Sequence, residues 1–152
     1  MRRMRGCALA REVARSGASV MQTWEMDKRK FVAPLPLPRL DSLSSYQQMS
    51  EMAIAHGMDP EPFRQAQMLK DATMAYRISE TWQEGKLFFH LNGSFHSDYK
   101  EGIVAYLKLY APRLRVLNIA TVRVSDPKAY RPPKSHLADF ILVVPESMTR
   151  TH

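Results

Sequence analysis

The sequence predicts an α/β protein with a mainly parallel sheet and flanking helices. Short apolar runs, typical of buried strands, occupy residues 87–91, 116–124 and 140–144. Segments in which apolar residues recur at helical spacing lie before and between these runs. A strand, a helix and a second strand in succession form a βαβ unit, so the runs at 87–91 and 116–124 are expected to be parallel strands.

The composition fits one globular domain, with its charge concentrated at one end. Of the 152 residues, 45% are hydrophobic and 24% are charged. Eight of the 22 basic side chains and three of the 15 acidic ones lie in residues 1–30, so this segment carries most of the net charge of +7. Such an end contacts phosphates or anionic membranes in some proteins, but a solvated basic end is the simpler interpretation. No specific nucleic-acid partner is expected.

Cysteine count and hydropathy limit the other classes of protein. A single cysteine, Cys7, excludes an intrachain disulfide and a cysteine metal cluster. The basic opening residues lack the apolar run of a signal peptide, so the chain as written is expected to be cytoplasmic. No apolar stretch approaches the roughly 20 residues of a transmembrane helix, and no transmembrane segment is expected.

Residues 1–31 are expected to form a basic N-terminal helix and strand. Leu9 and Val13 share one face of a helix over residues 8–16. The following residues 18–24, with sequence ASVMQTW, have the composition of a strand that ends at a carboxylate.

A proline-rich connector at residues 32–41 separates this block from the larger α/β portion at residues 42–148. Alternating prolines remove backbone donors, so the connector is neither a helix nor a central strand. Helical spacing then predicts helices at 42–56 and 59–83. Residues 149–152 form a tail.

The turn that contains Gly93 and His96 is the first candidate site. It lies between the strand at 87–91 and a helix that Asp98 and Glu101 are expected to cap as a capping box. Glycine permits backbone conformations that other residues resist. A histidine at a strand end binds a metal, shuttles a proton or hydrogen-bonds a substrate. A histidine that only caps the turn is the alternative.

Two carboxylates are further candidates. Glu25 follows the first predicted strand and would lie at the same edge of a parallel sheet as His96, as a metal ligand or a base. A solvated acid at a strand end is the alternative. Asp71 shares a helix face with Gln67 and Met74, which places a carboxylate beside apolar packing. It is either a capped polar group of the core or part of a site.

Three segments in this order resemble the C-terminal half of the ChaN-type haem-binding uptake family, within the Tiki/erythromycin-esterase-like superfamily. They are QAQMLKDATMAYRI (65–78), HLNGSFHSDYKEGIVAYL (90–107) and ADFILVVPESM (138–148). With their connecting residues the resemblance covers roughly residues 34–148. More loosely, QTWEMD (22–27) is similar to a strand-end Glu-Met element of the same family.

The resemblance implies an α/β fold with its site at the strand ends. It also implies a bacterial, often envelope-associated protein that acquires haem or iron. Gly93 and His96 match the second of two facing GxxH motifs, and Glu25 matches the strand-end acid. Three further residues match family positions without an assigned role: Asn92, Asp71 and Met74.

The chain departs from the family pattern in ways that favour binding over catalysis. No upstream Gly-Glu dipeptide begins a first motif, and the connector after Asp27 is short, so the fold looks truncated relative to the family. We expect haem binding, by a homodimer or with one haem face exposed. A hydrolase with a divalent metal on His96 and Glu25, or a non-functional remnant, are the alternatives. Tyrosinate also ligates haem iron, and the candidate tyrosines are Tyr99, Tyr106, Tyr110 and Tyr130.

Overall fold

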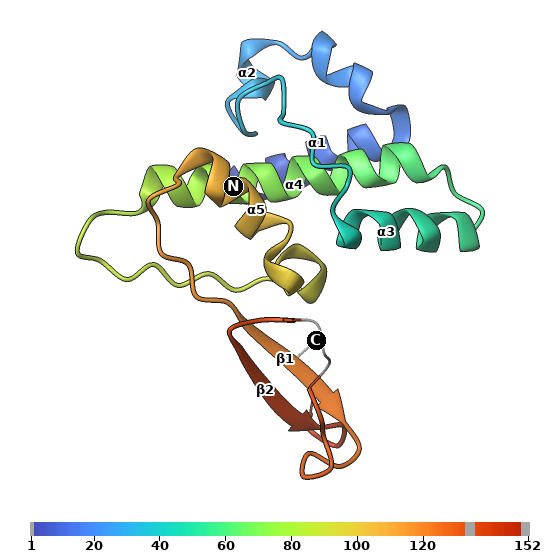
Figure 1. The fold of residues 1–152 in the computed structure, drawn as a ribbon. Helices are drawn as coiled ribbons and strands as arrows, with labels where there is room; N and C mark the ends of the chain where they lie inside the picture. The colour runs from blue at the N-terminus through green and yellow to red at the C-terminus, as the bar shows by residue number, and fades with distance from the viewer. Residues whose placement is uncertain (1, 133–135, 150–152) are drawn as a thin grey trace.

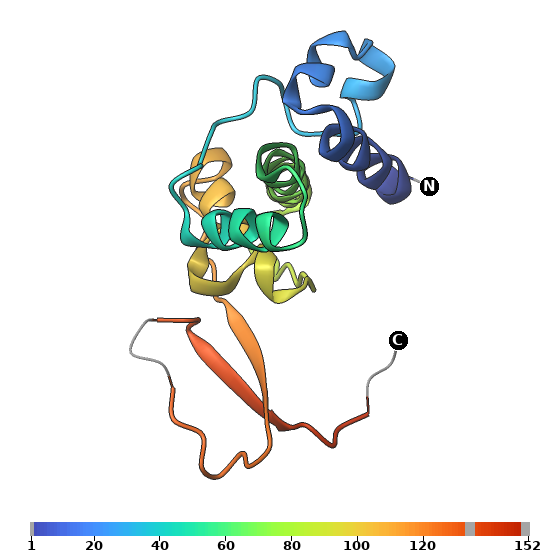
Figure 2. The same cartoon turned by 90° about the vertical axis from the view of Figure 1, so that its right-hand side faces the viewer.

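The computed structural model describes residues 2–132 and 136–149. In chain order its elements are α1 (Arg2–Ser16), the 3₁₀-helix η1 (Ala18–Thr23), α2 (Met26–Arg29), α3 (Ser44–Ala55), α4 (Pro60–Thr81), the 3₁₀-turns η2 (Ser94–His96) and η3 (Asp98–Lys100), α5 (Ile103–Tyr110), β1 (Ile119–Val124) and β2 (Phe140–Pro145). Helix α4 runs through the middle of the molecule, and α1, α3 and α5 each pack against it (Figure 1). Seen from the side, α1 forms one tier, α3, α4 and α5 the next, and the sheet a third (Figure 2).

Local signals and burial explain the central position of α4. The Asp59 carboxylate accepts a hydrogen bond from the Glu61 amide at 3.0 Å, and Pro60 occupies the first helical position. The helix then contributes to two buried clusters. The first comprises Ala33, Tyr46, Met68, Ala72, Ala75, Ile78, Ile103, Tyr106 and Leu107. The second comprises Leu9, Ala10, Val13, Trp24, Val32, Ala66 and Leu69. Burying apolar surface on both sides is what fixes α4 between its neighbours.

The predicted fold class is confirmed as a small α/β protein with a parallel sheet. Strands β1 and β2 pair in parallel, with Ile119 opposite Phe140 and Val124 opposite Pro145. The helices expected at 8–16, 42–56 and 59–83 form as α1, α3 and α4. None of the described helices is both long and apolar enough to cross a bilayer. Residues 150–152 of the expected tail lie outside the described residues.

The strand expected at residues 18–24 is wrong, because this segment forms η1 instead. Among the described residues no strand lies beside it to pair with its backbone. The Ala18 amide donates to the Gln65 side chain at 2.6 Å, and Gly17 enters the turn with a φ of 77°. The local composition of a strand is not enough where the chain offers no ladder partner.

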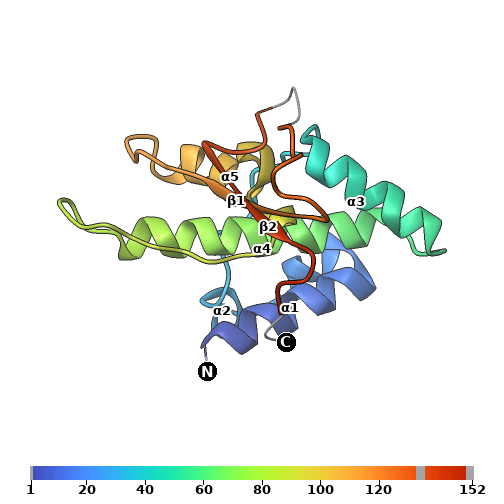
Figure 3. The same ribbon diagram turned by 90° about the horizontal axis from the view of Figure 1, so that it is seen from below.

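The strand expected at residues 87–91 is also wrong. The segment forms no strand, and it runs alongside α4 with Leu87 96% exposed (Figure 3). A strand buried on both faces needs covering layers, and here β1 pairs only with β2 in the described part of the chain. The parallel pair is therefore β1 with β2, rather than 87–91 with 116–124.

The capping box expected at Asp98 and Glu101 does not form, and α5 begins only at Ile103. Glu101 instead caps α3. Its carboxylate accepts hydrogen bonds from the Ser44 amide at 3.0 Å, the Ser44 hydroxyl at 2.9 Å and the Ser45 amide at 2.6 Å. Burial raises the pKa of Glu101, but the hydrogen bonds from Ser45 and Ser44 outweigh it and hold the pKa below its usual range.

Candidate functional site

His96 lies in a cluster with three side chains from α3 and α4, which we call the His96 cluster: His96, Asp71, Tyr46 and Gln67. The imidazole Nδ1 pairs with the Asp71 carboxylate oxygen Oδ1. The other oxygen, Oδ2, accepts a hydrogen bond from the Tyr46 hydroxyl at 2.8 Å. The Gln67 side-chain amide nitrogen lies 2.9 Å from the same Nδ1. The ring is thus held from one side only.

The carboxylate at the centre of this cluster is fully buried. Burial raises the pKa of Asp71, while the hydrogen bonds from His96 and Tyr46 and the charge of Lys70 act against the shift. Burial, the Asp71 charge and the Tyr106 hydroxyl in turn raise the pKa of Tyr46, so its hydroxyl stays a donor at all physiological pH values. A buried carboxylate that costs stability is typical of functional sites.

The opposite ring nitrogen of His96, Nε2, differs from Nδ1 in its surroundings. The side chain is 23% exposed, and Nε2 makes no hydrogen bond to any residue among 2–132 and 136–149. Because an ionised Asp71 accepts at Nδ1, we assign the proton to Nδ1 and the lone pair to Nε2. This assignment requires the Gln67 amide to turn its oxygen, rather than its nitrogen, toward Nδ1. Histidines that ligate metals in proteins are commonly oriented this way, by a carboxylate on the other nitrogen.

Strained backbone closes the turn behind His96. Tyr99 and Lys100 have φ values of 60° and 57°, unusual for residues other than glycine. Gly102 follows with a φ of 51°, and a Cβ there would lie 2.4 Å from the His96 carbonyl oxygen and 3.1 Å from Asp71 Oδ2. Only glycine allows the chain to pass this close to the cluster.

Gly93, the glycine of the predicted motif, has an ordinary conformation. Its φ is −76° and its ψ is 157°, and nothing lies within 4 Å of a Cβ added there. The expectation that this position needs glycine for its backbone is wrong. Asn92 is better placed to shape the turn, since its side-chain amide donates to the Gly93 carbonyl at 2.9 Å and to the Ser97 hydroxyl at 2.8 Å.

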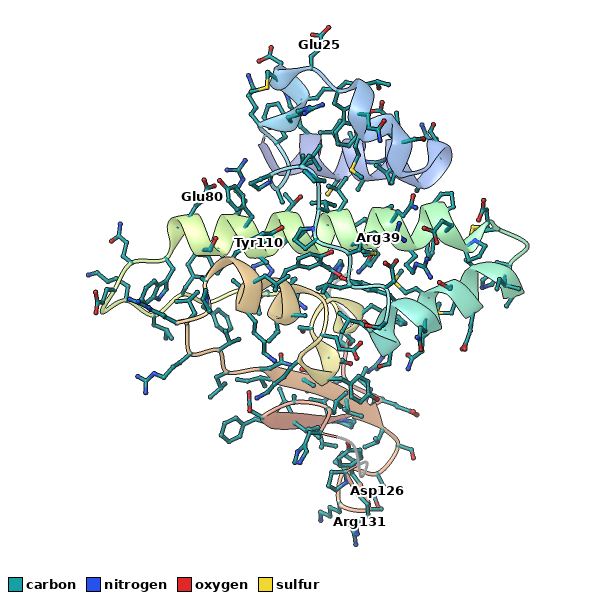
Figure 4. All side chains as sticks on the ribbon, turned by 45° about the horizontal axis from the view of Figure 1, so that its top comes forward. Glu25, Arg39, Glu80, Tyr110, Asp126 and Arg131 are labelled. Atoms are coloured by element: carbon teal, nitrogen blue, oxygen red, sulfur yellow. The ribbon has the colours of Figure 1, made fainter. Side chains whose placement is uncertain are left out.

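Glu25 and Met74 are not brought into the His96 cluster. Glu25 is exposed at the N-cap of α2, at the end of the molecule opposite the sheet (Figure 4). A shared sheet edge with His96 is ruled out, because the strand that would have created it forms η1. Met74 is half-buried and packs against the core around Tyr106. In the described ranges no three His, Cys, Asp or Glu side chains gather as a metal site would require.

The candidate tyrosines differ in accessibility. Tyr106 is buried and its hydroxyl donates to the Pro38 carbonyl at 2.8 Å, while burial raises its pKa. Burial likewise raises the pKa of Tyr110. Tyr130 lies half-buried in the loop between β1 and β2. Of the four, Tyr99 is the closest to His96 in sequence, and it is 39% exposed.

Two residues of the site have no signal in the sequence. Tyr46 lies far from Asp71 along the chain, and an aromatic residue at an apolar helix position is usually predicted to belong to the hydrophobic core. Gly102 sits next to a predicted capping residue, where glycine suggests only a turn. The sequence shows that Gln67 and Asp71 share a helix face, but it does not show that both contact His96.

The family model described as "Haem-binding uptake, Tiki superfamily, ChaN" matches residues 7–107. This range contains every residue of the His96 cluster. It differs from the expected coverage of 34–148, because it includes the N-terminal block and ends before β1. No curated protein and no solved structure matches the chain.

Proposed function

The chain belongs to the haem-binding uptake family of the Tiki superfamily, ChaN, and from that premise we propose that it binds haem with His96 as the axial ligand. The observation that carries this proposal is the orientation of His96. Its Nδ1 is tied to a fully buried carboxylate, while its Nε2 is left for an external ligand.

The composition of the site fits haem better than a bare metal ion. A divalent cation needs three or more protein ligands, whereas a porphyrin supplies four nitrogens to its iron and needs only an axial ligand or two from the protein. A single well-oriented histidine meets that need. When bound, haem iron would supply the chemistry of ligand exchange and electron transfer; the chain's own residues bind and orient it.

Exposed apolar side chains on the segment that leads into the turn, and in the turn itself, support the same ligand. Large apolar residues that are between 38% and 96% exposed lie on the segment before the turn and in the turn itself: Leu87, Phe88, Phe89 and Leu91, and then Phe95. Apolar surface of this extent usually marks a binding surface. A porphyrin is a flat, largely apolar group, so these exposed side chains would suit contact with it, and His96 would supply the ligand to its iron.

Titration with hemin tests the proposal. The purified chain is expected to shift the Soret band at micromolar hemin, and His96→Ala is expected to weaken binding. His56→Ala is the matched control, because His56 is exposed at the end of α3. Absence of any Soret shift, or equal binding by both variants, would contradict the proposal. Tyr99→Phe shows whether tyrosine contributes.

We also propose that haem binding serves iron uptake. The haem-binding form is proposed to be a homodimer. Light scattering of the haem-loaded protein measures its mass and tests the homodimer.

The alternative, a metal-dependent hydrolase that uses His96 and Glu25, is supported only by the Asp71–His96 pair, in which His96 would act as a base, because Glu25 lies away from the cluster. This alternative requires a stoichiometric divalent metal in the isolated protein. Elemental analysis decides between the two functions, and the absence of such a metal would count against the hydrolase.

A further inference from the structure

A cavity lies apart from the His96 cluster. It has a volume of about 540 Å³, between η1, the connector at residues 35–39 and α4. Its α4 residues are Gln65 and Met68, on a different face from Gln67 and Asp71, and no residue of the His96 cluster lines it. The volume falls within the range of small-molecule sites in proteins.

The walls of this cavity are mostly apolar. Met21 and Met68 face it from η1 and α4, and Leu35 and Leu37 from the connector. The Gln65 side chain is already engaged, since it accepts from the Ala18 amide at 2.6 Å and donates to Glu61 at 2.5 Å. An occupant would therefore be held mainly through apolar contact.

Two arginines line the same cavity. One forms ion pairs with carboxylates of the protein, and the other donates only to backbone carbonyls. Arg39, on the connector beside α4 (Figure 4), donates to both oxygens of Asp41 at 2.7 and 2.9 Å and to Glu61 at 3.2 Å. Its charge is offset within the protein. We therefore expect Arg39 to contribute little to the binding of an external anion.

Arg29, at the end of α2, has no such partner. Its Nε donates to the Trp24 carbonyl at 2.8 Å and its Nη2 to the Gln22 carbonyl at 3.3 Å. These bonds fix the guanidinium, but they leave donors unused and involve no carboxylate of the described residues. A half-buried, unpaired cation beside apolar walls favours an anion that brings apolar surface with it.

We propose that this cavity binds a carboxylate carried on an apolar body, with the carboxylate paired to Arg29. An acyl chain and the propionate of a porphyrin share this chemistry. No residue of the His96 cluster lines this cavity, so binding of the carboxylate does not depend on ligation of haem by His96.

Calorimetric titration of the full chain with decanoate, and with decanol as the neutral control, tests the inference. Decanoate is expected to bind about tenfold more tightly than decanol, because only the carboxylate pairs with Arg29. Arg29→Gln should remove that difference, and Arg29→Lys should keep most of it. Arg39→Gln is the matched control, because it removes an equal charge from the same cavity and should change decanoate binding little.

Competition identifies the source of the carboxylate. Displacement of decanoate by metal-free protoporphyrin, weakened in Arg29→Gln, would assign a porphyrin; failure to displace it would assign an acyl chain. His96→Ala should leave decanoate binding unchanged. Equal affinities for decanoate and decanol, equal effects of Arg29→Gln and Arg39→Gln, or no binding of decanoate would overturn the inference.

Discussion

At the scale of single residues, Asp71 sets the chemistry of His96 at a cost in stability. It is fully buried, and burial raises its pKa above the usual 3.8. Between that value and the raised pKa the folded state binds more protons than the unfolded state, so the contribution of Asp71 to stability falls as pH rises from about 4. The ionised carboxylate is tolerated because it orients the imidazole.

Asp71→Asn is therefore expected to raise the stability of the fold and to weaken haem binding. The neutral amide should raise the free energy of unfolding at pH 7 by about 1 kcal/mol, with the gain disappearing toward pH 4. An amide N–H facing Nδ1 would move the ring proton to Nε2 and weaken haem binding by about 10- to 100-fold. Thermal melts at both pH values and hemin titrations measure these effects. A destabilised variant with unchanged hemin affinity would contradict this role.

Glycine at position 102, rather than 93, is the residue that the site requires. Gly102→Ala places a Cβ 2.4 Å from the His96 carbonyl at a φ of 51°, and is expected to lower the free energy of unfolding by about 1–3 kcal/mol. Gly93→Ala is the matched control and should be close to neutral, since open space surrounds it. Chemical denaturation compares the two. Equal losses would show that the turn does not depend on Gly102.

At the scale of elements, Glu101 joins the turn after His96 to the start of α3. Glu101→Ala removes an acceptor from Ser44 and Ser45 and should cost about 1–2 kcal/mol at pH 7. Because the folded-state pKa of Glu101 is lowered, this contribution is present above its usual pKa of 4.5 and is lost as pH falls through the folded value.

Denaturation of Glu101→Ala at pH 7 and at acidic pH checks this expectation. Glu84→Ala, an exposed residue of the loop after α4, is the control and should be neutral at both. A loss for Glu101→Ala that does not shrink at acidic pH would rule out a role for the ionised carboxylate.

The elements also show which parts of the fold the sequence can predict. Helix α4 was predictable because its cap, its proline and its apolar spacing are all local. The segments at 18–24 and 87–91 have the composition of strands, but a strand exists only where another strand pairs with it, and that depends on distant residues. The pair of β1 and β2 satisfies this condition.

The same distinction governs the site. His96 and Asp71 could each be found from local pattern, because a turn histidine and a buried helical carboxylate are unusual. Their contact could not, since it depends on how the turn at 93–102 folds back on α4. The prediction that Glu25 lies beside His96 depends on a strand at residues 18–24, and because this segment forms η1, that prediction is wrong as well.

At the scale of the whole molecule, stability should be distributed unevenly between the tiers. Helix α4 lies between two buried clusters, whereas the described sheet has two strands with Ile119, Phe140 and Leu142 more than half exposed. Two-stranded sheets are marginal without further cover. Hydrogen exchange followed by mass spectrometry should find α4 the slowest to exchange and β1–β2 among the fastest. Equal protection would contradict this distribution.

The central claim concerns the axial ligand, and electron paramagnetic resonance of the ferrous nitrosyl haem complex tests it most directly. With His96 as the ligand, the wild-type spectrum should carry hyperfine splitting from an imidazole nitrogen, and isotopic labelling of histidine should change that splitting. His96→Ala should lose it, while His56→Ala should keep it. A splitting that persists in His96→Ala, or a wild-type spectrum without it, would contradict the assignment of His96.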